Sequence, residues 1–177
     1  MNKLLTAQEV KRALDRLELA VLKELPEDSP IAVVGIRTRG QTLADRIAHR
    51  IQAARGGLKV YRGVLDITFY RDDLARQRGA PVVRATEIDF NLDNAWVLLV
   101  DDVLQTGRSI RAALDALHDF GRPKCIRLAV LIDRGGRELP IAADFVGQHC
   151  RARTGQRIQV KLKENDGEDG VYIVTGT

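Results

Sequence analysis

The order of apolar and polar residues predicts alternating helices and strands over most of the chain. Thr6 and Glu9 have the spacing of a capping box, and the apolar positions after them recur at helical spacing, which predicts a helix from Ala7 to Leu25. The sequence PEDSP breaks this helix, and the apolar run IAVVGI at 31–36 is typical of a buried strand. After the turn RTRG, a second helical stripe comprises Leu43, Ile47, Ala48 and Ile51.

The alternation continues in the middle of the chain. Residues 57–70 are rich in β-branched and aromatic side chains and are expected to be extended. The sequence AWVLLV at 95–100 predicts a strand, 107–121 a helix, and CIRLAVLI at 125–132 another strand. Strands and helices that alternate in this way indicate an α/β fold, a mostly parallel sheet flanked by helices.

Two segments depart from this alternation. Residues 70–86 are charged, lack periodicity and contain Gly79 and Pro81, so we expect a mobile surface loop, with a strand possible at 82–88. From about residue 144 to 177, the short pieces DFVGQH, RIQVKLKE and GVYIVT are separated by turns, which predicts a small β-rich hood against the main sheet. The length of 177 residues fits one domain, 1–177, that includes both segments.

Composition restricts the class of protein and its compartment. With 45% hydrophobic, 29% charged and 5% aromatic residues, the chain resembles an ordinary soluble enzyme. It contains neither a signal peptide nor an apolar run of the roughly 20 residues that span a membrane, so we expect a cytoplasmic protein. The cysteines, Cys125 and Cys150, match no metal-binding spacing and are expected to be reduced.

The net charge of +4 has two interpretations. It can serve solubility alone, or it can attract an anionic partner such as a phosphorylated substrate or RNA. No ribonucleoprotein motif or zinc finger is visible in the sequence, so composition leaves both interpretations open.

The clearest candidate for chemistry is VLLVDDVLQTGRS at 97–109. Asp101 and Asp102 follow an apolar strand, and residues 106–109 open the next helix, where free N–H groups, hydroxyls and the helix dipole suit a phosphate. Gly107 lacks a Cβ, so the backbone can approach an anion closely. Carboxylates repel a phosphate, but they suit hydroxyls or a divalent cation beside it, and a sugar phosphate has this chemistry. The alternative is a solvated strand end followed by a helix cap.

The same stretch is similar to the phosphoribosyl pyrophosphate (PRPP) signature of type I phosphoribosyltransferases. Three further blocks, VGIRTRG, LDITFYRDDL and LAVLIDRGGRELPIAADFVG, extend the similarity over about residues 8–147. Together the four blocks resemble the PyrR family, whose members combine uracil phosphoribosyltransferase activity with regulation of pyrimidine operons.

This resemblance implies roles for the residues of each block. Asp101 and Asp102 are expected to bind the ribose hydroxyls, and residues 106–109 the 5′-phosphate. Thr38, Arg39 and Gly40 can present amides and a guanidinium to a second anion, which the resemblance implies is pyrophosphate, although RTRG can also be an ordinary turn. The expected catalytic residues are Asp101, Asp102 and Arg39. The remaining expected substrate-binding residues are Arg84, Val103, Leu104, Gln105, Thr106, Gly107, Arg108, Ser109, Ile132, Asp133 and Arg134.

Several of these assignments depend on the resemblance alone. Uracil is expected near Ile132, Asp133 and Arg134, held largely by backbone groups, although DRGGRE can also be a plain exposed turn. Tyr70, Arg71 and Arg84 are either pyrophosphate ligands on a closing loop or members of a solvated charged segment. Mg²⁺ is expected to bind with PRPP rather than in a site made by protein side chains. No catalytic role is assigned to His49, His118 or His149.

The resemblance also implies the partners and the alternatives. Expected partners are uracil, PRPP, UMP or UTP, operon leader RNA and further copies of this chain. Gln105, Gly136 and Ala142 stand where the family usually has Tyr, His and Arg, and QHCRART replaces a segment of the type N-x-P-T-S. These departures bear on RNA recognition more than on catalysis. A regulator without strong catalysis and a purine-type phosphoribosyltransferase therefore remain the alternatives.

Overall fold

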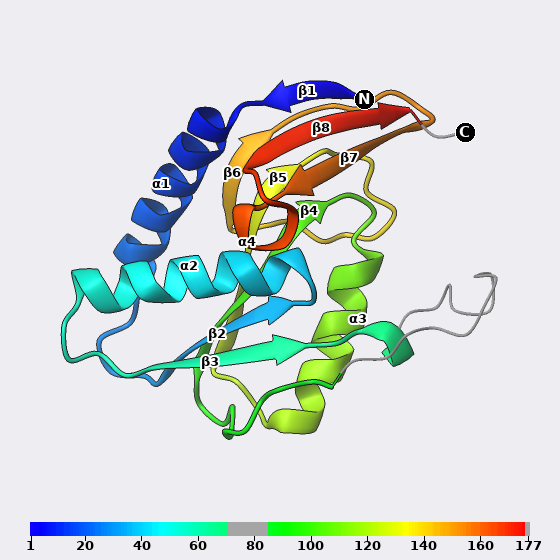
Figure 1. Ribbon diagram of the computed structural model, residues 1–177. Helices are drawn as coiled ribbons and strands as arrows, with labels where there is room; N and C mark the ends of the chain where they lie inside the picture. The colour runs from blue at the N-terminus through cyan, green and yellow to red at the C-terminus, as the bar shows by residue number, and fades with distance from the viewer. Residues whose placement is uncertain (71–84, 176–177) are drawn as a thin grey trace.

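The main sheet is parallel throughout, as the alternation of strands and helices predicted. The computed structural model describes residues 1–70 and 85–175 (Figure 1). Five strands lie in the order β3-β2-β4-β5-β6. Their bounds are β2 Ile31–Ile36, β3 Val60–Leu65, β4 Trp96–Leu104, β5 Cys125–Asp133 and β6 Phe145–His149. Because all neighbours are parallel, the carboxyl ends of the strands meet at one edge of the sheet.

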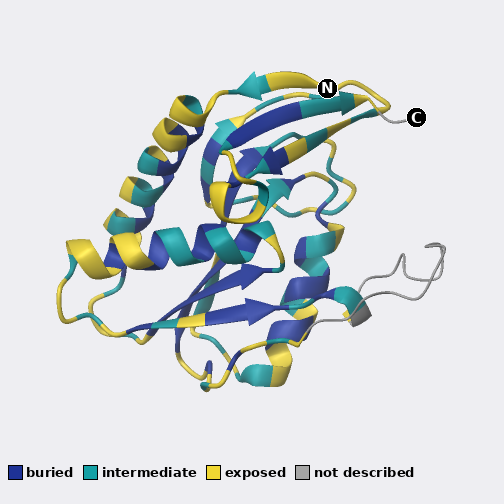
Figure 2. Cartoon of the chain, in the orientation of Figure 1, coloured by how far each residue is buried: buried dark blue, intermediate teal, exposed yellow. Residues whose placement is uncertain are grey.

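Helices cover both faces of this sheet. Helices α1 (Ala7–Glu24) and α2 (Arg39–Ala54) pack on one face with Val33, Leu98 and other residues of the strands. Helix α3 (Arg108–Leu117) packs on the other face, where Val34 and Leu99 belong to a second apolar cluster. All six residues of β2 are buried (Figure 2), which explains why that strand reads as a continuous apolar run. Within the described residues, no helix is long and apolar enough to cross a membrane.

Helix α1 begins where its capping box predicted. The Glu9 N–H donates to Thr6 Oγ1 at 3.4 Å, and the Thr6 N–H donates to the Glu9 carboxylate at 2.8 Å. The helix ends at Glu24, one residue before the predicted end, because Leu25 is already extended. Helix α3 ends earlier than expected, at Leu117, and the 3₁₀ turn η3 (His118–Phe120) completes the predicted segment.

The hood is a separate antiparallel sheet with the strand order β1-β8-β7. It comprises β1 (Asn2–Leu5), β7 (Gln156–Lys161) and β8 (Gly170–Thr175), with the short helix α4 (Lys163–Asp166) between the last two. Figure 1 shows this sheet beyond the carboxyl edge of the main sheet. Strand β1 was not predicted, because four residues before a helix carry little periodicity.

The prediction that DFVGQH belongs to the hood is wrong. These residues form β6, an edge strand of the main sheet that pairs in parallel with β5. A five-residue strand with alternating burial, such as FVGQH, has the same pattern in either sheet, so its partner depends on tertiary packing. A Cβ at Gly147 would lie 2.7 Å from the Leu131 carbonyl and 3.4 Å from that of Ala13, so glycine lets α1 pack closely over this strand.

The segment after β3 is only partly as expected. The predicted extended run 57–70 is shorter, because β3 ends at Leu65 and Thr68–Tyr70 form the 3₁₀ turn η1. Of the strand considered at 82–88, the described part contributes an isolated antiparallel bridge between Glu87 and Val64. Residues 71–84, which hold most of the predicted loop with Arg71 and Arg84, lie outside the described residues.

Candidate functional site

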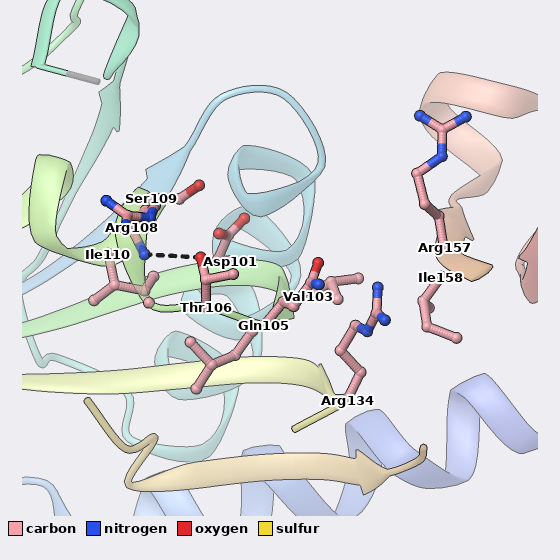
Figure 3. A pocket seen from close by; sticks show the side chains of 12 residues that line it. Asp101, Val103, Gln105, Thr106, Arg108, Ser109, Ile110, Arg134, Arg157 and Ile158 are labelled. Carbon is pink, nitrogen blue, oxygen red and sulfur yellow. Dashed lines mark hydrogen bonds between the residues drawn. The ribbon is translucent and has the colours of Figure 1, made fainter. Parts of the chain in front are cut away.

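A cavity of about 390 Å³ opens between the carboxyl edge of the main sheet and the hood. Residues 103–110 and Asp101 line it from β4, the following loop and the start of α3, and Arg134 lines it from the end of β5. Arg157 and Ile158 of β7 lie across from the loop (Figure 3). The volume is in the range of small-molecule sites, and the position matches the usual ligand site of an open parallel sheet.

The two acids lie inside β4, not after it. The strand continues to Leu104 because β5 runs on beside it, with Val103 opposite Ile132 and Leu104 opposite Asp133. Asp101 is 8% exposed and lines the cavity, and its Oδ1 accepts the Asp102 N–H at 2.9 Å. Asp102 adjoins the cavity without being part of its lining. The acids therefore have different environments although they are neighbours in sequence.

The side chain of Asp102 keeps part of its surface exposed, unlike that of Asp101, but desolvation by the surrounding protein still raises its pKa. Hydrogen bonding with Asp101 and the positive charge of Arg39 oppose this rise, but they do not cancel it. A carboxylate held at a raised pKa has an energetic cost in the free protein, and a ligand that donates hydrogen bonds to it reduces that cost.

The loop after β4 turns sharply into α3. Gly107 has a φ of 91°, the left-handed region that glycine favours, and it precedes the first residue of the helix. Thr106 Oγ1 accepts the Arg108 N–H at 3.3 Å, shown as the dashed line in Figure 3. Ser109 follows in the first turn of the helix. Hydroxyls and backbone N–H groups thus gather at one helix N-terminus, an arrangement that suits an anion.

The segment after β5 braces this loop from outside. The N–H groups of Glu138 and Leu139 donate to the Thr106 carbonyl at 3.0 and 3.1 Å. Arg137 donates to the Gln105 carbonyl at 2.9 Å, and the Arg108 guanidinium donates to Glu138 at 2.8 Å. The backbone of the loop is therefore fixed before any ligand arrives.

Two glycines let the start of α2 pack directly against the main sheet, Gly40 against β4 and Gly35, a residue of β2, against α2. A Cβ at Gly40 would lie 2.6 Å from the Val100 carbonyl oxygen and 3.2 Å from the Cα of Asp101. A Cβ at Gly35 would lie 2.4 Å from the Cα of Gln41. The Arg37–Thr38 peptide that leads into the helix is cis. Thr38, Arg39 and Gly40 consequently adjoin the two acids, although they are not part of the cavity lining.

The residues expected to surround uracil are only partly brought to the cavity. Ile132 is fully buried in the core. Asp133 accepts from Arg137 at 2.6 Å and from the Gly135 N–H at 2.9 Å, and it lines a neighbouring hollow with His149 and Cys150. Burial opposes ionisation of Asp133, but these hydrogen bonds outweigh it, so its pKa lies below the ordinary value. Arg134 lines the main cavity, and its buried Nε has no hydrogen-bond partner among the described residues.

Sequence reasoning missed the contribution of the hood. Ile158 shares the alternation of Val160 and Leu162, which are buried, so the pattern could have indicated that Ile158 faces the main body. No pattern indicated that β7 would lie over the loop after β4. Tyr70, for which a pyrophosphate ligand and a member of a solvated charged segment were both open, donates to the Asp119 carboxylate, while Arg84 lies outside the described residues.

The sequence is similar to known phosphoribosyltransferases over nearly its whole length. Residues 1–165 match the phosphoribosyl transferase domain family. The chain is 52% identical over 177 residues to the bifunctional protein PyrR of Roseiflexus sp. (strain RS-1), covering 99% of this chain and 96% of that protein. It is 47% identical over 170 residues to the bifunctional protein PyrR of Deinococcus radiodurans, covering 96% and 92%.

Solved structures agree at the level of the fold. The hypoxanthine phosphoribosyltransferase of Trypanosoma cruzi superposes with a TM-score of 0.71 at 13% identity, covering 100% of this chain and 98% of that one. A hypoxanthine phosphoribosyltransferase from Staphylococcus aureus gives a TM-score of 0.69 at 18% identity, covering 96% and 90%. The TM-scores show that the fold is shared, whereas identities this low do not indicate which base this chain accepts.

Proposed function

The chain belongs to the PyrR family of phosphoribosyltransferases, and we propose that it converts uracil and PRPP to UMP and pyrophosphate. The observation that carries this proposal is the cavity at the end of β4, where Asp101 adjoins the N-terminus of α3. Carboxylates beside an anion site suit a ligand that joins hydroxyls to a phosphate, and ribose 5-phosphate is such a ligand.

The residues that line the cavity and those that adjoin it have distinct tasks in this proposal. Thr106, Gly107, Arg108 and Ser109 hold the 5′-phosphate through N–H groups and hydroxyls, and Val103, Leu104 and Gln105 contribute mainly backbone. Asp101 and Asp102 accept hydrogen bonds from the ribose 2′ and 3′ hydroxyls. Arg39, with the amides of Thr38 and Gly40, binds pyrophosphate, and Arg84, which lies outside the described residues, is proposed as a further pyrophosphate ligand. Uracil lies near Arg134, whose buried Nε needs an acceptor, and near backbone groups of Ile132 and Asp133.

The donor set fits a magnesium ion that is bound mainly by its substrate. Over residues 1–70 and 85–175, no three His, Cys, Asp or Glu side chains gather as a metal site. Mg²⁺ prefers oxygen ligands and usually keeps only one or two from protein carboxylates, so Asp101 and Asp102 would suffice beside PRPP oxygens. When bound, the ion would neutralise charge on the departing pyrophosphate.

The test is product formation from uracil, PRPP and Mg²⁺, with hypoxanthine and guanine as competing bases. We expect UMP from uracil and no nucleotide from the purines. In Asp101→Asn, kcat/KM should fall by about 10- to 100-fold, because hydrogen bonds to charged groups contribute about 1.5–3 kcal/mol. Asp45→Asn, the same change on α2 outside the cavity, should retain activity. Turnover with hypoxanthine and none with uracil would contradict the proposal.

A second function is regulation of pyrimidine genes through binding of leader RNA when UMP or UTP fills the same cavity. The bifunctional relatives and the net charge of +4 support it. Gln105, Gly136 and Ala142 differ from the residues that the family usually has at these positions, and the differences bear on RNA recognition. The affinity for RNA is therefore the quantity to measure. Binding of the leader RNA should strengthen with UMP and weaken as salt rises, whereas a shuffled RNA should show no response to UMP. RNA affinity that is independent of both UMP and salt would exclude this function.

The proposal also covers the cellular compartment and the oligomeric state of the protein. Cys125 and Cys150 are free thiols, which fits the reducing cytoplasm. We propose that the chain self-associates, as the family resemblance implies. Light scattering of the purified protein should give a multiple of 19.7 kDa.

A further inference from the structure

A cluster of ion pairs joins the hood to α2. Asp166 of α4 accepts from Arg39 at 2.7 and 3.1 Å, so the guanidinium donates through both Nε and Nη2. About two turns further along α2, Arg46 donates to Glu164 at 2.5 and 2.9 Å and to Asp169 at 2.8 and 3.0 Å. Thr42 donates to Asn165 at 2.7 Å between these pairs. The short segment 163–169 therefore contacts one face of α2 almost entirely through polar groups.

Arg39 and Arg46 both bind carboxylates of the hood segment, but they differ in what else surrounds them. Arg39 is the first residue of α2, where Gly40 packs against the end of β4. The Arg39 guanidinium therefore interacts with carboxylates on two sides of the fold: it is hydrogen-bonded to Asp166 of the hood, and its charge also acts on Asp102 of the main sheet. Arg46 is more than one turn away, and both its carboxylate partners belong to the hood segment. Of the two arginines, Arg39 is therefore the one that connects this segment to the candidate site.

We infer that Asp166 is a positioning residue: it holds the Arg39 guanidinium at the pyrophosphate side of the cavity, so that the hood prepares the site for the leaving group. This inference rests on the proposed function. It gives the hood a task beyond covering the cavity.

The geometry favours positioning over a merely structural contact. A planar guanidinium held through two parallel hydrogen bonds has a fixed orientation, unlike an arginine that contacts solvent. Asp166 is itself fixed, because its Oδ2 also accepts the Leu162 N–H at 2.9 Å. The side chains of Arg39 and Asp166 are only 30% and 17% exposed. An arginine that is already oriented loses less conformational entropy when an anion binds.

The charge states are compatible with this arrangement. The hydrogen bond from Arg39 lowers the pKa of Asp166 despite partial burial, so the carboxylate is ionised at neutral pH. The same hydrogen bond raises the pKa of Arg39. The pair therefore stays charged throughout the range in which an enzyme assay is run.

The decisive comparison is Asp166→Asn against Glu164→Gln. Both variants change a hood acid to its amide and weaken one ion pair with α2, but only the first acts on Arg39. The carbonyl oxygen of the introduced amide in D166N can still accept the Leu162 N–H, so the turn is retained. We expect D166N to raise KM for PRPP about tenfold with KM for uracil unchanged, and E164Q to leave both values near those of the unmodified protein.

Three outcomes would overturn the inference. In the first, KM for PRPP is unchanged in D166N. In the second, KM for PRPP rises equally in D166N and E164Q. In the third, KM for PRPP falls in D166N, and this fall would mean that Asp166 competes with pyrophosphate for Arg39. Thermal melts of both variants establish that each is folded.

Calorimetry of Mg²⁺-pyrophosphate binding to the full chain separates this inference from the proposed function. It does not depend on uracil, and D166N should bind pyrophosphate about tenfold more weakly than E164Q does. Pyrophosphate affinity that is equal in D166N and E164Q, or absent from the unmodified protein, overturns the positioning role. Failure to form UMP while pyrophosphate binding depends on Asp166 overturns the proposed function alone.

Discussion

At the scale of single residues, the two adjacent acids of β4 differ in their surroundings and in what those surroundings do to their charge. Asp101 lines the cavity and is held by the Asp102 N–H, whereas burial raises the pKa of Asp102. A buried carboxylate that is not fully compensated weakens the fold, and such a group is retained where a ligand uses it. We therefore expect ionised Asp102 to lower the free energy of unfolding and, in the proposed function, to bind the ribose.

Replacing Asp102 by Asn should raise stability and lower activity. Because the folded-state pKa is raised above the value of about 3.9 in an unfolded chain, the folded protein retains a proton that the unfolded chain has lost. The free energy of unfolding should then fall as pH rises from about 4 through the folded-state pKa. Asn does not titrate, so the melting temperature of D102N should exceed that of the unmodified protein at pH 7, and the difference should shrink towards pH 4.

The same variant should lose UMP formation, since an amide cannot replace a carboxylate as acceptor for two hydroxyls. Thermal melts across the pH range and the UMP assay test the two effects separately. A lower melting temperature at pH 7 would show that the attraction between Asp102 and Arg39 outweighs burial.

At the scale of elements, the contact between α2 and β4 sets the geometry of the site. Gly40 allows this contact, because any larger residue would place a Cβ 2.6 Å from the Val100 carbonyl oxygen. Helix α2 therefore begins beside Asp101 and carries Arg39 to the edge of the cavity. A residue without a Cβ thus lets the main chains of two elements approach each other closely.

Gly40→Ala should displace the start of α2. Overpacking costs about 1–3 kcal/mol, which corresponds to a fall in melting temperature of roughly 2–10 °C for a chain of this size. The KM for PRPP should rise because Arg39 moves with the helix. Gly56→Ala is the matched control, since no atom lies within 4 Å of its added Cβ. Equal melting temperatures for the two variants would mean that the contact adjusts freely.

The elements differ in how far the sequence predicts them. The main strands and α1 follow from apolar runs and a capping box, since these patterns depend on local spacing. The loop after β4 was recognisable because hydroxyls, glycine and acids stand in the order that a phosphate site needs. The sheet to which β6 belongs, the presence of β1 and the end of β3 at Leu65 depend on packing between distant segments, which spacing does not encode.

At the scale of the whole molecule, the cavity is a shared product of two sheets. The main sheet supplies Asp101 and the loop into α3, and the hood supplies Arg157 and Ile158. The same hood holds Arg39 through Asp166. The sequence indicated the first half of this candidate site and not the second, because the position of β7 over the loop depends on packing between segments that are far apart in the sequence. In the proposed function, the hood therefore takes part in binding as well as covering the cavity.

The most direct test of the account is calorimetric binding of UMP and of uridine to the purified protein. If the N-terminus of α3 holds a 5′-phosphate, uridine should bind at least about 100-fold more weakly than UMP, since several hydrogen bonds to a charged group are lost. In Asp101→Asn, UMP affinity should fall while Asp45→Asn keeps it. Uridine and UMP binding with equal affinity would contradict the central claim that this cavity is built for a ribose 5-phosphate.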